Sequence, residues 1–122
     1  MSSLLDVDTT AAENTVLTDV LGPHAKVKIL AALLGESDRD LNATEIARLA
    51  GIDRTTFYEH VEDLLAYGMI EKTRTVGNSQ MYRIDRENPA AEDLARMEWH
   101  LLDQIEEAGE VEEAEETGEA ED

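Results

Sequence analysis

The chain has 122 residues, which fits a single domain, and its 29 acidic and 10 basic residues give a formal net charge of −19. It has no cysteine, which excludes a disulfide framework, a thiolate metal site and a thiol-based redox switch. The sequence lacks the pattern of a signal peptide and any apolar run near the roughly 20 residues that span a bilayer. We therefore expect a soluble cytoplasmic protein with no membrane partner.

The acidic charge is concentrated at the two ends of the chain. Residues 1–21 carry a net charge of −4, residues 22–86 only −1, and residues 87–122 carry −14. Nine of the ten basic residues lie in the middle segment. The whole-chain charge argues against an anionic partner, but the middle segment taken alone does not.

Two helices are expected in the first 35 residues. Residues 1–9 carry few large apolar side chains and are expected to be a flexible N-terminus. Thr10 and Glu13 form a capping-box pattern, which predicts a helix over residues 10–21. One face of this helix carries Val16, Leu17, Val20 and Leu21. Pro23 suits the first position of a second helix. In that helix Val27, Leu30, Leu33 and Leu34 recur at helical spacing.

Two further helices are separated by a short turn. Leu41 is expected in a very short strand, and Asn42 with Glu45 forms another capping box. The helix that follows ends at Gly51, and its predicted inward side chains are Ile46, Leu49 and Ala50. Asp53 is a good N-cap for the next helix. The predicted core face of that helix carries Phe57, Val61, Leu64 and Leu65.

The pattern changes from helical to alternating after Met69. Residues 69–75 and 80–84 predict two strands joined by residues 76–79, which is a hairpin signature. Pro89 begins the last helix, and one stripe of it carries Leu94, Met97, Leu101 and Ile105. Residues 106–122 are rich in Glu with Ala, Gly and Thr, and are predicted to be a disordered acidic tail.

Two helices, a Gly-containing turn and a following hairpin make a helix-turn-helix with a wing. Residues 43–64, ATEIARLAGIDRTTFYEHVEDL, resemble winged helix-turn-helix transcriptional regulators of the MarR, ArsR and PadR kind. The resemblance covers residues 24–86 and implies a mainly α fold with a small β-hairpin wing. The acidic surplus, with seven Arg against three Lys, resembles a haloarchaeal, PadR-like member of the oxidative-stress response. The resemblance implies a sequence-specific DNA-binding regulator.

The predicted DNA surface combines the starts of two helices with the wing. In this fold the N-terminal turn of the recognition helix meets base edges in the major groove. Arg54 suits bidentate pairing with guanine, Thr55 a thymine methyl group, and Glu59 cytosine N4. The N-terminus of the Asn42-capped helix suits a phosphate. The predicted DNA-binding residues are Asn42, Thr44, Arg54, Thr55, Thr56, Tyr58, Glu59, Lys72, Arg74, Asn78, Ser79, Gln80 and Arg83.

Several of these residues have a second interpretation. Arg54 can be a solvated residue of a first helical turn, and Glu59 can repel phosphate. Lys72 and Arg74 can form ion pairs with neighbouring acids, namely Glu71, Asp85 or Glu87. The alternative function is therefore a winged-helix module that binds a protein and not DNA.

The last helix also predicts a homodimer, because its apolar stripe is too long for a small domain to cover. The domain is placed at residues 10–105, with dimerisation helices over residues 10–21 and 89–105. Two recognition helices would then meet successive major grooves of a roughly palindromic operator. The predicted dimer residues are Val16, Val20, Leu94, Met97, Trp99, Leu101, Leu102 and Ile105.

Neither a cofactor nor an enzymatic activity is expected. The three histidines lack metal-ligand spacing, and the sequence has no catalytic arrangement or phosphate-binding glycine loop. Inorganic cations are expected at the DNA interface at high salt, between protein carboxylates and DNA phosphates.

Overall fold

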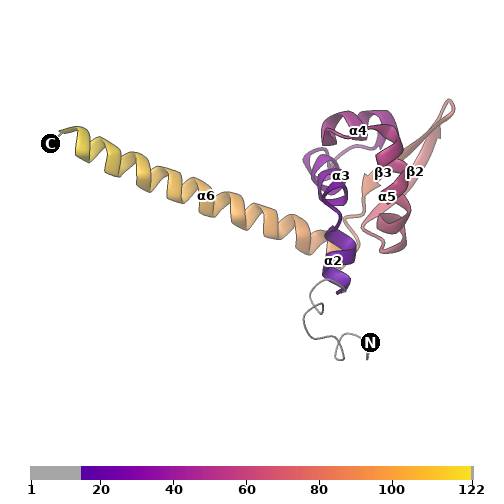
Figure 1. Ribbon diagram of the computed structural model, residues 1–122, viewed down its shortest axis with the longest axis horizontal. Coiled ribbons are helices and arrows are strands. Elements are labelled where there is room, and N and C mark those ends of the chain that lie inside the picture. The colour runs from indigo at the N-terminus through magenta and orange to yellow at the C-terminus, as the bar shows by residue number, and fades with distance from the viewer. Residues whose placement is uncertain (1–14, 122) are drawn as a thin grey trace.

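The computed structural model describes the backbone of residues 15–121 and the side chains of residues 15–109. The helices are α2 (Val16–Leu21), α3 (His24–Gly35), α4 (Ala43–Ala50), α5 (Arg54–Ala66) and α6 (Pro89–Glu121). The strands are β1 (Leu41–Asn42), β2 (Ile70–Val76) and β3 (Ser79–Ile84). Helices α3, α4 and α5 pack with the sheet, while α6 projects away on the side opposite the wing tip (Figure 1). The predicted winged helix-turn-helix fold is confirmed.

The wing is the β2–β3 hairpin of a three-stranded antiparallel sheet with the order β1-β3-β2. The register between β2 and β3 shifts between Lys72 and Thr75. Gly77 has a φ of 61°, a left-handed conformation that suits a tight turn. The strands therefore reach Val76 and Ser79, and the connection is shorter than the four residues predicted.

The predicted boundaries of the helix-turn-helix are confirmed. The Asn42 side chain accepts a hydrogen bond from the Glu45 backbone N–H at 2.9 Å, and the Glu45 carboxylate accepts one from the Asn42 N–H at 3.0 Å. Gly51 ends α4 with a φ of 71°. The Asp53 carboxylate accepts from the Thr56 N–H at 2.7 Å and so starts α5. These local hydrogen bonds fix the turn that presents α5.

The core lies between helices α3 to α5 and the sheet. Its largest apolar side chains are Ile29, Leu30, Leu33, Leu41, Ile46, Phe57, Val61, Leu64, Ile70 and Ile84. Phe57 packs edge to face on Tyr82 with ring centroids 5.3 Å apart. The core face predicted for α5 is confirmed, since Phe57, Val61 and Leu64 are buried and Leu65 packs against them.

Two predicted core side chains are instead exposed. Val27 is 39% exposed, because α3 packs through Ile29 and the residues in phase with it. Leu49 is 48% exposed, because α4 packs through a row of small side chains and Ile46. Both helices carry apolar residues on more than one face, so helical spacing alone does not select the packed face.

The first described helix is shorter than predicted. Helix α2 begins at Val16, and the Thr15 hydroxyl accepts a hydrogen bond from the Thr18 N–H at 3.1 Å, which makes Thr15 the N-cap. The expected flexible segment 1–9 and the capping box at residues 10–13 lie outside the described residues.

The last helix is longer than predicted. Helix α6 continues to Glu121, whereas the sequence predicted a disordered acidic tail over residues 106–122. The physical reason is local, because Glu and Ala have high helix propensity and no proline interrupts the segment. Among the described helices, none is long and apolar enough to cross a membrane.

Candidate nucleic-acid interface

The first turn of α5 presents an exposed arginine. The Arg54 guanidinium carbon lies 5.9 Å from the centroid of the Tyr58 ring, within the range of a cation–π contact. Tyr58 is 49% exposed and packs edge-on against the buried Phe57 ring at 5.3 Å. Tyr58 therefore links the exposed Arg54 to the buried Phe57 of the core. Thr55 beside it is exposed, and Thr56 is half-buried.

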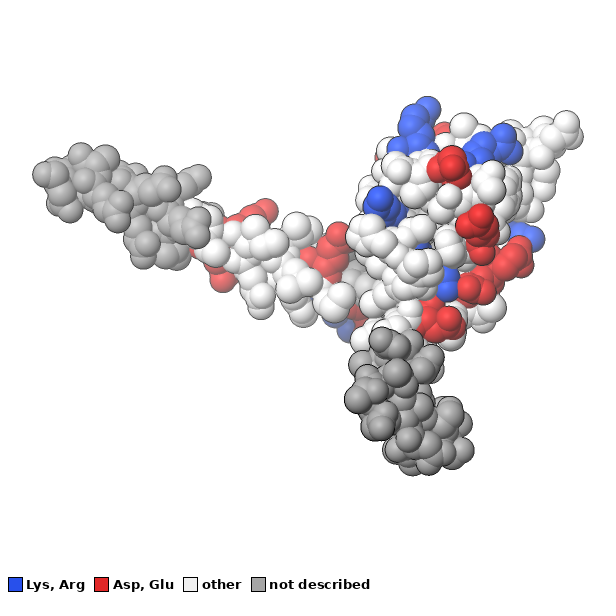
Figure 2. Space-filling view, in the orientation of Figure 1, with Lys and Arg blue, Asp and Glu red and all other residues white. Residues whose placement is uncertain are grey.

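The rest of the exposed face of α5 is acidic. Glu59 and Asp63 have side chains 61% and 55% exposed, and Glu62 is also exposed. Figure 2 shows acidic side chains in a band on the α5 side of the domain, while basic side chains gather toward the α4 end. In α5, which is the recognition helix, only the N-terminal end therefore offers positive charge to the phosphate backbone of DNA.

Arg74 on the wing has an acidic partner that the sequence did not indicate. Its Nε lies 2.9 Å from Oδ2 of Asp40 and its Nη2 lies 3.1 Å from Oδ1, a bidentate pair. The Thr73 hydroxyl donates to the same carboxylate. The hydrogen bonds from Arg74 and Thr73 lower the pKa of Asp40 to about 2. The third nitrogen of the Arg74 guanidinium, Nη1, takes no part in these two hydrogen bonds to Asp40.

The other wing residues fall into two groups. Arg83 lies 3.6 Å from the Glu71 carboxylate, and the Gln80 amide donates to the backbone oxygens of Arg74 and Met81. Both side chains therefore brace the hairpin. Exposed on the wing are Lys72, Asn78 and Ser79.

The N-terminus of α4 offers less to a phosphate than the sequence implied. The Glu45 carboxylate caps this end, and its Oε2 lies 4.0 Å from Nη1 of Arg39. A carboxylate here opposes a second anion, although a bare helix N-terminus attracts one. Asn42 uses its side-chain oxygen for the cap, while Thr44 is exposed.

A buried lysine joins the recognition helix to α2. Lys26 is 2% exposed, its Nζ lies 2.7 Å from Oδ2 of Asp63, and it donates to the Asp19 backbone oxygen at 2.8 Å. The Tyr67 hydroxyl donates to the Asp19 carboxylate. These contacts lower the pKa of Asp63 and raise that of Tyr67. Lys26 lies three and seven residues before the buried Ile29 and Leu33, so helical spacing places it on the same buried face of α3. This spacing is the sequence feature that indicates the burial of Lys26.

Four of the ten basic side chains form no ion pair with any side chain that the structure describes. They are Lys28, Arg48, Arg54 and Lys72. Arg54 and Lys72 were predicted to contact DNA. Lys28 and Arg48 were not singled out, and they lie on α3 and α4.

An apolar groove lies where α2, the end of α5 and the start of α6 meet. Its volume is about 440 Å³, and its walls include Val16, Val20, Leu94 and Met97. The apolar surface continues along α6. There Met97, Trp99, Leu101, Leu102 and Ile105 are 49–66% exposed.

The fold and the exposed first turn of α5 are those of a winged helix-turn-helix protein. Residues 24–85, which span α3 to β3, match the family described as "Sugar-specific transcriptional regulator TrmB", and the chain belongs to this family. It is therefore a DNA-binding transcriptional regulator.

Three solved structures illustrate the likeness in fold. AntR, an antimony-specific transcriptional repressor, is 24% identical with a TM-score of 0.59, covering 88% of this chain and 96% of its own. A homodimeric winged helix-turn-helix DNA-binding domain from Mycobacterium bovis is 23% identical, with a TM-score of 0.54 and coverages of 84% and 93%. HlyU from Vibrio cholerae is 16% identical, with a TM-score of 0.57 and coverages of 78% and 97%. No curated protein sequence matches the chain.

Proposed function

We propose that the protein binds a roughly palindromic DNA operator sequence-specifically, as a homodimer. One observation carries this proposal. Arg54 is exposed at the first turn of α5, rests against the Tyr58 ring and has no ion pair with a described side chain. In a chain of net charge −19, a guanidinium left unpaired at this position suits the paired acceptors of a guanine.

The neighbouring side chains extend this base contact. Thr55 suits a thymine methyl group and Glu59 the amino group of a cytosine. Lys72 is the wing cation that forms no ion pair with a described side chain. Nη1 of Arg74 suits a phosphate, while Asp40 holds the opposite edge of the guanidinium. Phosphate contacts of this kind orient the protein, whereas base contacts select the sequence.

The proposed dimer uses α2 and α6. Leu101 and Ile105 are 49% and 66% exposed on a helix that projects from its own domain (Figure 1). An exposed apolar stripe of this length favours burial against a second copy. The Mycobacterium bovis domain of similar fold is described as homodimeric, which supports a homodimer here.

We also propose a halophilic archaeal host and a role in a stress response. The acidic surface of α5 lies next to the proposed DNA contacts, so inorganic cations between Glu59, Glu62 and DNA phosphates would offset the repulsion. The excess of acidic residues and of Arg over Lys supports a high-salt environment.

A second candidate function is a winged-helix module that binds protein only. The exposed acidic residues of α5 favour it, because they repel a duplex at low salt. A genome-wide map of bound DNA, made with and without oxidative stress, separates the two functions. If the protein is a sequence-specific regulator, the bound fragments are expected to share a site made of two inverted half-sites about 10 base pairs apart. The absence of any shared sequence among the recovered fragments would favour the protein-binding module.

A further inference from the structure

The pairing of the two wing strands is irregular next to Arg74. From Lys72 to Thr75 strand β2 advances by three residues, while the paired residues of β3, Tyr82 to Gln80, advance by only two. One extra residue therefore lies in β2 between Lys72 and Thr75, which is the arrangement of a β-bulge. A bulge changes the direction of the side chains that it carries.

The bulge brings two neighbouring side chains to one carboxylate. In a regular strand, successive side chains point to opposite faces of the sheet. Thr73 and Arg74 follow each other in β2, yet both donate hydrogen bonds to the side chain of Asp40. From β3, the Gln80 amide donates to the backbone oxygen of Arg74 at 3.1 Å. The backbone and the guanidinium of Arg74 are therefore each held by a separate contact.

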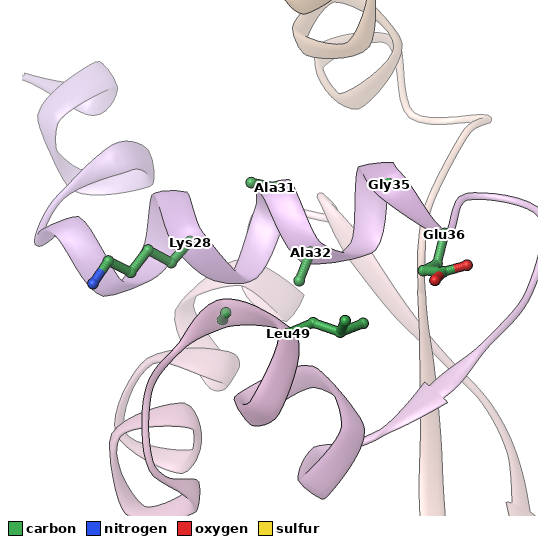
Figure 3. Close-up of a pocket in the computed structure, with 7 residues that line it drawn as sticks. Lys28, Ala31, Ala32, Gly35, Glu36 and Leu49 are labelled. Atoms are coloured by element: carbon green, nitrogen blue, oxygen red, sulfur yellow. The ribbon is translucent and has the colours of Figure 1, made fainter.

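The loop that carries Asp40 is anchored to the helices on both sides of it. Nε of Arg39 lies 3.3 Å from Oε2 of Glu36, which directly follows α3, and its Nη1 lies 4.0 Å from Oε2 of Glu45 in α4. Figure 3 shows this loop leaving Glu36 and continuing through β1 into α4, beside the pocket between α3 and α4. The Asp40 side chain is only 12% exposed. Asp40 is therefore a fixed support for Arg74.

The contact with Asp40 occupies one side of the Arg74 guanidinium. Nε and Nη2 donate to the two carboxylate oxygens, so the N–H groups of Nη1 and the second N–H of Nη2 take no part in it. These N–H groups form an edge that matches two oxygens of one phosphate. The Arg74 side chain is 65% exposed, so this edge is accessible from solvent.

We propose that Asp40 and Gln80 are positioning residues that hold the guanidinium of Arg74 with its outer edge toward a DNA phosphate. Each acts through Arg74 and does not contact DNA itself, in place of the direct contact that the sequence predicted for Gln80. This inference rests on the proposed function, because it takes Arg74 as a contact between the wing and the DNA backbone.

The proposal predicts an effect opposite to that of charge alone. A carboxylate close to a DNA phosphate repels it, so removing the charge of Asp40 would strengthen binding if only charge mattered. A guanidinium that is already held loses less conformational freedom on binding than a free one does. Removing Asp40 is therefore expected to weaken binding, and the sign of the change distinguishes the two effects.

The test measures the affinity of the full-length protein for the duplex most enriched in the map of bound DNA, and for a scrambled version of it. Asp40→Asn keeps the shape of the side chain and is expected to weaken both duplexes by the same factor, about three- to tenfold, since phosphate contacts do not read sequence. Asp38→Asn removes an exposed carboxylate of the same loop and is expected to weaken neither. Equal or tighter binding by Asp40→Asn overturns the proposal.

A second set of variants separates positioning from a general role in wing structure. Gln80→Met keeps the length of the side chain, removes the donor and is expected to weaken binding in the same direction as Asp40→Asn. In an Arg74→Ala background, neither substitution is expected to cause further loss, because both act through the missing guanidinium. Losses that add to that of Arg74→Ala would show a role independent of Arg74 and contradict the proposal.

Arg74→Lys keeps the positive charge but cannot form the bidentate pair with Asp40. We expect it to lose nearly as much affinity as Arg74→Ala, and wild-type affinity in this variant would also contradict the proposal. If the wild type binds neither duplex, the proposed function fails and this inference fails with it. If the wild type prefers the enriched duplex but Asp40→Asn binds it as tightly, only the positioning role fails.

Discussion

Asp40 and Arg74 are 34 positions apart and form a bidentate ion pair, with N–O distances of 2.9 and 3.1 Å. Asp40 immediately precedes β1, and Arg74 lies on β2, so the pair spans the sheet from one edge strand toward the other. It ties Arg74, two residues before the end of β2, to the residue that precedes β1 and α4. The proposed phosphate contacts of the wing depend on that placement.

The Asp40 carboxylate predicts a specific pH dependence of stability. Its pKa is lowered from 3.8 to about 2, so its ionised form stabilises the folded state above pH 4. This contribution is lost as the pH falls toward 2. The difference in unfolding free energy between wild type and Asp40→Asn, measured with urea, is therefore expected to shrink over that range. Asp38→Asn changes an exposed carboxylate of the same loop and provides the control. A difference that stays constant between pH 6 and pH 2 would contradict this role.

The buried Lys26 predicts a large effect of removing one charge. Lys26→Met keeps the bulk of the side chain but removes the ammonium group. The Asp19 backbone oxygen loses its hydrogen bond to this group, and the Asp63 carboxylate loses its ion pair. We expect a loss of about 1–3 kcal/mol in the free energy of unfolding. Lys28→Met removes a lysine without an ion pair and is expected to cost less than about 0.5 kcal/mol. Urea unfolding of both variants measures the comparison, and equal losses would speak against the Lys26 network.

Features formed by residues that lie close together in the sequence were predictable. The Asn42–Glu45 box, the Asp53 cap and the Gly51 stop each involve residues three or fewer positions from a helix end, and all are confirmed. The hairpin followed from alternation around Gly77. Such features need only local geometry and side-chain type.

Long-range pairing was not predictable from one sequence. Asp40 meets Arg74 and Lys26 meets Asp63 only after the helices and the sheet have packed. The exposure of Leu49 likewise depends on which face of α4 the other helices cover. Helix α6 extends beyond Glu106, where the lack of large apolar side chains predicts disorder while the helix propensity of Glu and Ala favours a helix.

The proposed dimer predicts that charge on the α6 stripe produces monomers. Leu101→Glu with Ile105→Glu places carboxylates in the proposed apolar interface and is expected to abolish dimerisation. Operator affinity should fall with it, because two half-sites then no longer bind together. Glu107→Lys changes charge on the opposite face of the same helix and should leave the dimer intact. Light scattering and operator titration test this, and a double variant that remains dimeric would place the interface elsewhere.

The acidic face of α5 predicts an abnormal salt dependence of operator binding. Ordinary counterion release gives a slope of about −0.9 in the logarithm of affinity per phosphate neutralised. Cation uptake between carboxylates and phosphates offsets this release, so binding is expected to persist at molar KCl with a slope near zero or positive. Glu62→Gln removes one of these carboxylates without touching a proposed base contact and should make the slope more negative. A steep negative slope for the wild type would contradict the proposed cation sites.

The most direct test of the DNA-binding assignment is a competition between operator variants, measured with wild type and Arg54→Ala. Loss of a bidentate base contact is expected to cost about 1–3 kcal/mol on the operator and to remove the preference at one base pair of each half-site. Lys72→Ala should instead weaken all duplexes alike, because it removes a phosphate contact and leaves base readout intact. If Arg54→Ala keeps both the affinity and the base preference of the wild type, the recognition surface on α5 is wrong.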